Sequence, residues 1–86
     1  MPDSSSYDPV LSGVAVQFFA GLTRKRQRKL IGLLLQLAEE PYQLGDFESS
    51  DATGRRLENI ILDDWRVTYW ADHAARELRI MDVAEL

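Results

Sequence analysis

Cysteine is absent from this chain of 86 residues. Disulfide bonds therefore contribute nothing to its stability, and thiolate catalysis and zinc–thiolate sites are excluded. No stretch approaches the ~20 consecutive apolar residues of a membrane-spanning helix. Residues 1–7 contain neither a basic nor an apolar region, so we expect no secretory signal peptide. These absences predict a soluble cytoplasmic protein with no membrane partner.

Familiar catalytic motifs are also missing. The sequence contains no P-loop, dinucleotide-binding fingerprint, HExxH motif or nucleophile elbow. We therefore predict neither a cofactor nor a metal site. The only histidine, His73, follows Asp72 in a predicted loop, where a histidine is usually an exposed bystander.

Basic residues are concentrated in one short segment. The net charge of −4 at pH 7 argues mildly against a protein that coats nucleic acid. Five of the ten basic residues nevertheless lie close together, at Arg24, Lys25, Arg26, Arg28 and Lys29. On a helix, like charges at i, i+4 are unfavourable by about 0.2–0.5 kcal/mol per pair, and cations oppose the dipole at a helix start. Two interpretations remain open: a solvated face that maintains solubility, or a docking patch for phosphate or an acidic partner.

The chain divides into a tail and one domain. Residues 1–6 are predicted to form a flexible N-terminal tail, and residues 7–86 a single α+β domain. Residues 7–11 suit a short strand. Pro9 confines that strand to a sheet edge, because proline has no N–H to donate.

Two helices are predicted next. Ser12 and Thr23 can serve as N-caps, because a side-chain hydroxyl accepts a hydrogen bond from a free backbone N–H. The link at residues 21–23 is so short that the helices must form an antiparallel hairpin. The second helix is expected from about Arg24 to Glu39, with an apolar stripe too wide for one partner helix, so we expect it to pack on a sheet. That stripe contains Leu30, Leu34 and Leu37.

The second half of the chain predicts a three-stranded antiparallel meander. Residues 41–54, rich in turn-forming and acidic residues, indicate an irregular connection. Short runs of β-branched and aromatic residues follow at 57–62, 65–70 and 78–83. Asp63-Asp64 predicts a tight turn, and residues 71–75 a longer hairpin loop. We expect the helices to cover one face of this meander and leave the other open.

Arg66 is the most informative residue of the predicted middle strand. Alternation places it with Thr68 and Trp70 on the face opposite Trp65 and Val67. A guanidinium on an open sheet face can bind phosphate with two parallel hydrogen bonds, which suits contact with an RNA backbone. The alternative is a cross-strand salt bridge, for example to Glu58 or Asp82.

Several strings carry a resemblance by their order and spacing. They are YDPVLS at 7–12, FAGL at 19–22, LAEEP at 37–41, GRRL at 54–57, DWRVTY at 64–69 and LRIMDV at 78–83. Together they resemble the RelE/ParE superfamily, the toxin components of bacterial type II toxin–antitoxin pairs, over nearly the whole chain. The resemblance implies a RelE/ParE-like fold and a cognate antitoxin as partner. It implies either the ribosome with its mRNA, or a topoisomerase, as target.

The resemblance also implies roles for individual residues. Arg66 lies at the characteristic arginine of the family's middle strand and is predicted to be catalytic. The resemblance also implies that Arg55 or Arg56 helps to bind a phosphate. The basic run described above adds Arg24, Lys25, Arg28 and Lys29 as predicted phosphate-binding residues. Ribosome-dependent members of the family continue into a tail of basic, histidine or tyrosine residues used in cleavage. Residues 83–86 contain none of these, so we expect cleavage to be weak or absent.

We therefore predict a RelE-like toxin-family component that binds an antitoxin and acts as a weak ribosome-dependent mRNA endonuclease. The first alternative is a ParE-like topoisomerase inhibitor or a catalytically inactive toxin-fold binding protein. The second is an unrelated small interaction module with the same layers. A neighbouring gene for an acidic or DNA-binding partner would favour the toxin–antitoxin hypotheses.

Overall fold

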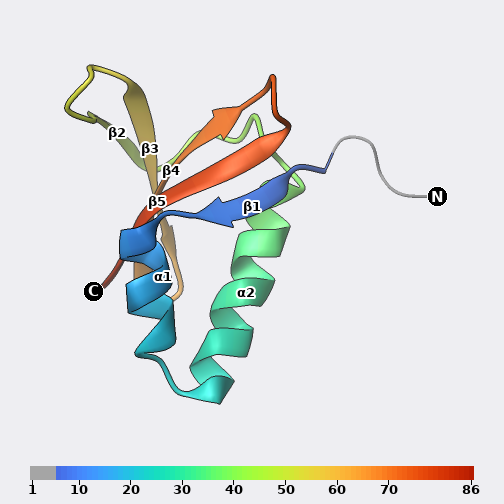
Figure 1. Ribbon diagram of the computed structural model, residues 1–86, viewed down its shortest axis with the longest axis vertical. Helices are drawn as coiled ribbons and strands as arrows, with labels where there is room; N and C mark the ends of the chain where they lie inside the picture. Colours follow the sequence, from blue (N-terminus) through green and yellow to red (C-terminus); the bar gives the residue numbers. More distant parts are fainter. Residues whose placement is uncertain (1–5) are drawn as a thin grey trace.

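The computed structural model describes residues 6–86. The elements follow one another as β1 (Asp8–Leu11), α1 (Gly13–Ala20), α2 (Arg24–Ala38), β2 (Phe47–Ser50), β3 (Arg56–Leu62), β4 (Trp65–Asp72) and β5 (Glu77–Glu85). Figure 1 shows the two helices as an antiparallel pair beside a twisted sheet. The predicted flexible tail lies outside the described residues, apart from Ser6.

Both predicted helix N-caps are confirmed. Ser12 Oγ accepts a hydrogen bond from the Ala15 N–H at 3.2 Å, and Thr23 Oγ1 accepts one from the Arg26 N–H at 3.3 Å. Each bond satisfies a backbone donor that has no partner within its helix. Ser12 also donates to the carbonyl of Met81 at 2.7 Å, which ties the start of α1 to β5.

The sheet has five strands, in the order β1-β5-β4-β3-β2. The predicted antiparallel meander is present as β3-β4-β5, but it is the centre of a larger mixed sheet. β1 lies at one edge, as expected from Pro9, and pairs in parallel with β5. The prediction of an edge strand followed by a three-stranded meander is therefore correct in outline and incomplete in detail.

The strand β2 corrects the prediction that residues 41–54 are an irregular connection. All four of its residues are exposed, so it lacks the alternation of apolar and polar residues that marks a half-buried strand. Its pairing depends on backbone and polar contacts with β3, beginning with the Asp46 N–H and the Asn59 carbonyl at 2.7 Å. A Cβ at Gly45 would overlap the Asn59 backbone, so only glycine permits this close approach.

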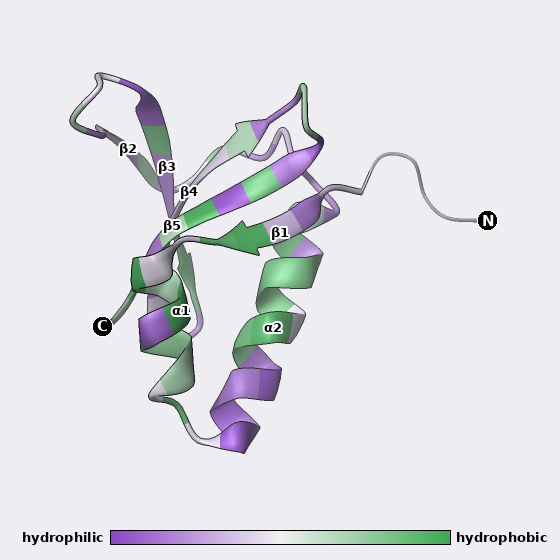
Figure 2. Cartoon of the chain, in the orientation of Figure 1, coloured by the Kyte–Doolittle hydropathy of each residue, from purple (hydrophilic) through white to green (hydrophobic). Residues whose placement is uncertain are grey.

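The core lies between α2 and the sheet. Leu30, Leu34 and Leu37 are all buried, which confirms the predicted stripe. They belong to one cluster with sheet residues that include Trp65, Val67, Tyr69, Leu78 and Ile80. Figure 2 shows the division along α2, whose first part is hydrophilic and whose later part is mainly hydrophobic. Neither helix within residues 6–86 is long and apolar enough to span a membrane.

Candidate functional site

A β-bulge decides which side chains share the open face of the sheet. Thr68 pairs with Asp82, whereas Tyr69 pairs with Ile80, so Met81 is an extra residue in β5. Without it, Asp82 would point to the same face as the buried Ile80. The insertion instead places Asp82 on the face of Arg66, opposite the helices.

Arg66 is held in place by this carboxylate. Its Nη2 lies 3.0 Å from Asp82 Oδ2, and both side chains are partly exposed, by 36% and 41%. Within residues 6–86, no hydrogen-bond partner reaches the buried Nε of Arg66. The enclosed Nε is not open to an external anion, but the side chain as a whole is partly exposed, so its Nη groups retain donor capacity for a phosphate or carboxylate oxygen. The salt bridge to Asp82 that the sequence left open is present, while Glu58 instead contacts Arg56.

Beside this pair lies a chain of polar side chains across three strands. Thr68 Oγ1 donates to Asn59 Oδ1 at 2.7 Å, and Asn59 Nδ2 donates to Ser49 Oγ at 3.0 Å. Asn59 and Thr68 are buried even though they lie on the face away from the helices. Buried polar groups that satisfy each other hold a surface rigid. The sequence did not reveal this network, because Asn59 stands within an apolar run and its partner Ser49 lies in the unrecognised β2.

Arg55 and Arg56 lie at the start of β3, where the two side chains have different surroundings. The Arg55 guanidinium stacks over the Trp70 ring at 3.9 Å. Arg56 Nε contacts Glu48 at 2.7 Å and Glu58 at 2.8 Å, so two carboxylates already surround its charge. Arg55 is therefore the better candidate to contact an anion, with Trp70 presenting an aromatic surface beside it.

The loop before Arg55 is ordered by one carboxylate. Asp51 Oδ1 accepts hydrogen bonds from the Thr53 hydroxyl at 2.6 Å, the Thr53 N–H at 2.8 Å and the Arg55 N–H at 3.0 Å. These bonds, the Thr53 hydroxyl first, lower the pKa of Asp51, because they stabilise its charged form. The backbone that presents Arg55 is thus fixed by local contacts.

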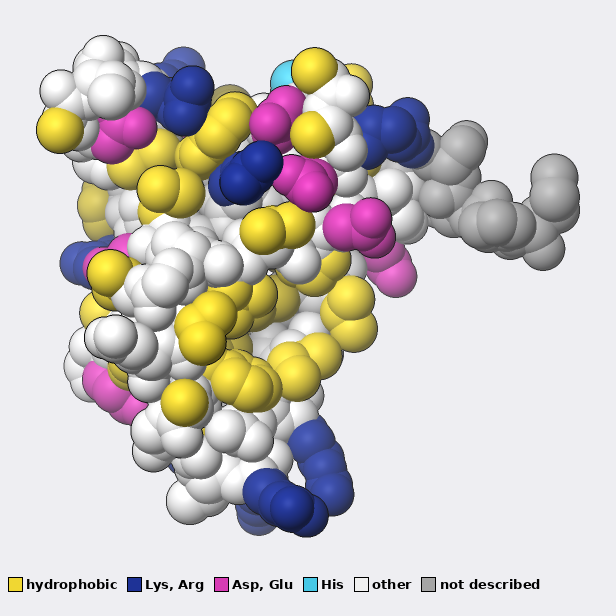
Figure 3. All heavy atoms as spheres, viewed as in Figure 1, with side chains coloured by type: hydrophobic (Ala, Val, Ile, Leu, Met, Phe, Trp, Pro, Cys, Tyr) yellow, Lys and Arg dark blue, Asp and Glu magenta, His cyan; other side chains and the backbone are white. Residues whose placement is uncertain are grey.

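The basic residues at the start of α2 fall into two groups, those held in ion pairs and those that are exposed and form none. Arg26 lies 4.9 Å above the Trp65 ring and pairs with Glu85 at 2.8 Å, and its hydrogen bond lowers the pKa of Glu85. Lys29 pairs with Asp63. The other three, Arg24, Lys25 and Arg28, are exposed and form no ion pair among the described residues. Figure 3 shows Lys and Arg side chains gathered at the end of the molecule where α2 begins.

The predicted phosphate-binding residues do not form a single cluster. Arg66 and Arg55 share the open face. Arg55 lies over Trp70, which is four residues from Arg66 on β4, so the two arginines are about 13 Å apart. The exposed cations of α2 lie on the helical side, because Arg26 of the same segment covers Trp65 in the core. The structure therefore supports two separate basic areas, the open face with Arg66 and Arg55 and the start of α2.

The sequence also missed an aromatic cluster at the end of the β4–β5 hairpin. The Tyr7 hydroxyl and His73 Nδ1 are hydrogen-bonded at 2.8 Å, and Tyr42 stacks on His73 with ring centroids 4.6 Å apart. Although His73 is exposed as predicted, it organises two tyrosines that are distant in the sequence. No local pattern indicates such a contact. The described residues contain no group of three His, Asp or Glu side chains placed to hold a metal ion.

Comparison with known proteins connects this architecture to solved structures. No protein-family model and no curated protein matches the chain. A chain of the RelBE2 toxin–antitoxin complex from Mycobacterium tuberculosis superposes with a TM-score of 0.78 at 14% identity, covering 100% of this chain and 98% of that one. The chain has the fold of the RelE toxins.

Two further structures support the same RelE fold. The RelE–RelB complex from Pyrococcus horikoshii matches with a TM-score of 0.68 at 17% identity, over 93% of this chain and 94% of that one. The isolated RelE toxin from E. coli matches with a TM-score of 0.65 at 17% identity, over 93% and 84%. The predicted resemblance to the RelE/ParE superfamily is thus confirmed at the level of the fold.

Proposed function

We propose that this protein is the toxin-family component of a toxin–antitoxin pair, that it acts in the cytoplasm, and that its open sheet face binds RNA phosphate through Arg66. The RelE fold supports the class of protein, since two of the similar structures are complexes with antitoxins. The observation that carries the site is the Arg66 guanidinium on that face, whose side chain is 36% exposed and is oriented by Asp82. Arg55, stacked on Trp70, extends the surface along β4.

The chemistry of RNA cleavage limits the activity that this site can support. Cleavage requires a base for the 2′-hydroxyl, an acid for the leaving oxygen and a cation for the charge that develops on phosphate. Arg66 supplies the cation, and the Asp82 carboxylate at 3.0 Å is placed to accept a proton. Within residues 6–86, no histidine, lysine or tyrosine side chain is hydrogen-bonded to the Arg66–Asp82 pair, so no general acid is held there. We therefore expect weak ribosome-dependent cleavage, since loss of a general acid costs about 10²–10⁴ in rate.

The Arg66–Asp82 pair also favours a second candidate, a catalytically inactive toxin-fold binding protein. A carboxylate at 3.0 Å offsets much of the charge that would otherwise stabilise the phosphate. On this alternative, the open face would bind RNA or a target protein without chemistry. The two candidates differ in one outcome, whether ribosome-bound mRNA is cut.

A translation reaction with purified ribosomes tests this difference. Primer extension on the mRNA should reveal weak cuts with the wild-type protein and none with Arg66→Gln. Arg76→Gln is the matched control, because it removes the same charge from the β4–β5 turn and should leave cleavage unchanged. An uncut mRNA with every variant would favour the inactive binding protein. Inhibition of a purified topoisomerase in place of mRNA cleavage would favour the ParE-like alternative.

The antitoxin needs an apolar surface, and the helical hairpin provides one. Ile31 and Leu35 are 44% and 50% exposed and lie one turn apart on α2. On α1, Val14 is 61% exposed. Figure 3 shows hydrophobic side chains gathered over the face formed by the two helices. An amphipathic helix of the antitoxin would bury this surface in the manner of other helix-in-groove complexes.

Co-expression with the product of the neighbouring gene tests the partner. The two chains should elute together in gel filtration at micromolar concentration. An Ile31→Asp, Leu35→Asp variant should separate them, because it places two charges in the proposed contact. Glu48→Gln on β2 is a control that should leave the complex intact. Separate elution of the wild-type chains would contradict the proposed function.

A further inference from the structure

The charges on α2 oppose its dipole at the end of the helix as well as at the beginning. Its last turn contains no basic residue, and the next two residues are Glu39 and Glu40, both exposed. The C-terminal end of a helix carries partial negative charge and favours cations. Two carboxylates there raise the negative potential instead, and that potential would be relieved by a cation from outside the chain.

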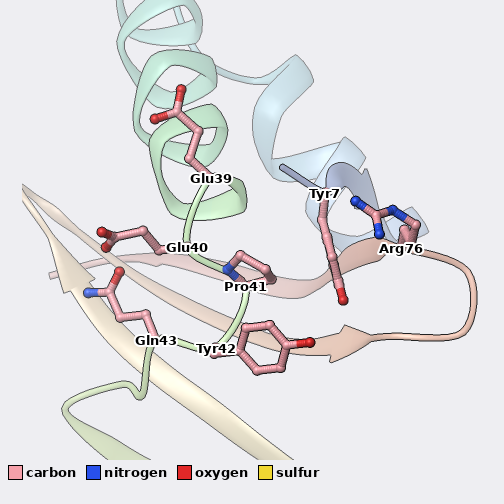
Figure 4. Close-up of a pocket in the computed structure, with 7 residues that line it drawn as sticks. All are labelled: Tyr7, Glu39, Glu40, Pro41, Tyr42, Gln43 and Arg76. Atoms are coloured by element: carbon pink, nitrogen blue, oxygen red, sulfur yellow. The ribbon is translucent and has the colours of Figure 1, made fainter. Parts of the chain in front are cut away.

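A pocket of about 600 Å³ lies at this end of α2. Figure 4 shows its lining, with Glu39 and Glu40 from the helix end and Pro41, Tyr42 and Gln43 from the following loop. Tyr7, just before β1, and Arg76, from the β4–β5 turn, complete it. Pro41 is buried, whereas Tyr42 is 75% exposed. The pocket therefore combines two carboxylates with two tyrosine rings.

The tyrosine rings are held in fixed positions. Tyr42 stacks on His73 with an interplanar angle of 11°, and Tyr7 meets Tyr42 edge-on with centroids 6.5 Å apart. Tyr7 is further fixed by its hydrogen bond to His73 and by its backbone N–H, which donates to the carbonyl of Ala38 at 2.9 Å. Aromatic faces held in place beside carboxylates attract cations without a cost for ordering the rings.

One cation is already present at the rim. The guanidinium of Arg76 lies 5.3 Å from the centroid of Tyr7, which shows that this ring accepts a guanidinium. In the view of Figure 4, Tyr7 stands between Arg76 and Glu39. Arg76 forms no ion pair with Glu39 or Glu40 among the described residues. The two carboxylates and one guanidinium of the lining leave a net negative charge at a helix end that has no basic residue.

We propose that this pocket receives a basic side chain, an arginine or a lysine, from a bound protein segment. The carboxylates of Glu39 and Glu40 pair with its charge, and the exposed ring of Tyr42 contacts its stem and head, while the buried Tyr7 ring supports Tyr42. The assignment of that segment to the antitoxin rests on the proposed function. A nucleotide is disfavoured, because its phosphate would face both carboxylates and the negative end of α2.

A titration of the isotope-labelled full chain, followed by backbone amide NMR, tests the pocket without any antitoxin. The probe is N-acetyl-arginine methylamide, and the matched probe is the citrulline analogue, which has the same shape but no charge. Saturable shifts should appear at Tyr7, Glu39, Glu40, Tyr42, Gln43 and Arg76 with the arginine probe alone; Pro41 has no amide proton to observe. Equal shifts with citrulline, or no saturable shift up to the solubility limit, would overturn the proposal. The same shifts with adenosine monophosphate would overturn it in favour of a nucleotide site.

Variants assign the contributions of the lining. Glu39→Gln with Glu40→Gln should weaken arginine binding about 3- to 10-fold, and Tyr42→Ala about 2- to 5-fold. Arg76→Gln should strengthen binding by up to about 5-fold, because it removes a like charge. A control with Glu48→Gln and Asp63→Asn removes two acidic charges outside the pocket and should change nothing. Weaker arginine binding after Arg76→Gln would contradict the proposed charge preference.

The test separates this inference from the proposed function. A chain that binds the arginine probe but elutes apart from the neighbouring gene product would support the pocket and contradict the antitoxin assignment. A chain that forms the complex but ignores the probe would support the proposed function and overturn the pocket.

Discussion

Arg66 and Asp82 face each other on the open side of the sheet, with Nη2 and Oδ2 3.0 Å apart, because Met81 is inserted into β5 between Asp82 and the buried Ile80. The bulge gives the arginine a fixed direction and a competing anion at the same time. An arriving phosphate must share the guanidinium with Asp82 or displace it. This relationship can be tested from both partners.

Asp82→Asn should increase the affinity of the open face for RNA by about 2- to 5-fold, the range expected when a partly exposed ion pair is released. Arg66→Gln should decrease it. Fluorescence anisotropy with a labelled single-stranded oligonucleotide at low salt measures both. Glu39→Gln, which removes a negative charge at the end of α2 and away from the open face, is the matched control and should leave affinity unchanged. A loss of affinity in Asp82→Asn would mean that the carboxylate positions Arg66 rather than competing for it.

Removal of the exposed cations at the start of α2 should stabilise the fold. Arg24→Gln and Lys25→Gln each remove a charge that opposes the helix dipole, so each should raise the free energy of unfolding by about 0.3–1 kcal/mol. Urea denaturation measures the change. Arg26→Gln is the contrasting variant and should destabilise, because Arg26 covers Trp65 and pairs with Glu85. Equal destabilisation by all three substitutions would contradict the division of roles within the segment.

Leu34→Ala should reduce the free energy of unfolding by about 2–5 kcal/mol, because it removes a side chain packed between α2 and the sheet. Leu34 is 2% exposed, and its neighbour Leu35 is 50% exposed on the same helix. Leu35→Ala therefore makes the same chemical change at the surface and should cost less than about 0.5 kcal/mol. Identical denaturation midpoints for the two variants would show that α2 does not pack as described.

Tyr69 should make stability depend on alkaline pH. Burial, followed by the charges of Glu58 and Asp46, raises the pKa of Tyr69 from 10.0 to about 12. Its neutral form is therefore favoured in the folded state, and this contribution is complete below about pH 10. It is lost as pH rises from about 10 to 12. Tyr69→Phe should flatten this part of the stability–pH curve, although it also loses the 2.8 Å hydrogen bond to the Gln43 carbonyl. An unchanged curve would exclude Tyr69 as its source.

Much of the fold followed from local rules. The hydroxyls of Ser12 and Thr23 cap their helices, because a cap needs only a backbone N–H a few residues away. Pro9 occupies an edge strand, because its own missing N–H excludes it from a central one. The turn at Asp63-Asp64 is also as predicted, with Asp63 at a positive φ of 57°. The helical stripe and the strand alternation placed Leu34 in the core and Arg66 on the opposite face of the sheet.

The sequence by itself therefore determined the two helices, the central meander and the candidate arginine, since periods of 3.6 and 2 residues translate directly into faces. Only the tertiary structure decided the rest. β2 pairs through its backbone, so its side chains carry no pattern, and Tyr7 meets His73 across 66 positions of sequence. The bulge at Met81 reverses the alternation of β5 after Ile80 and places Asp82 beside Arg66. The sequence of β5 alone does not specify this bulge, because the register of a strand depends on which of its side chains can be buried together with those of its partner strand.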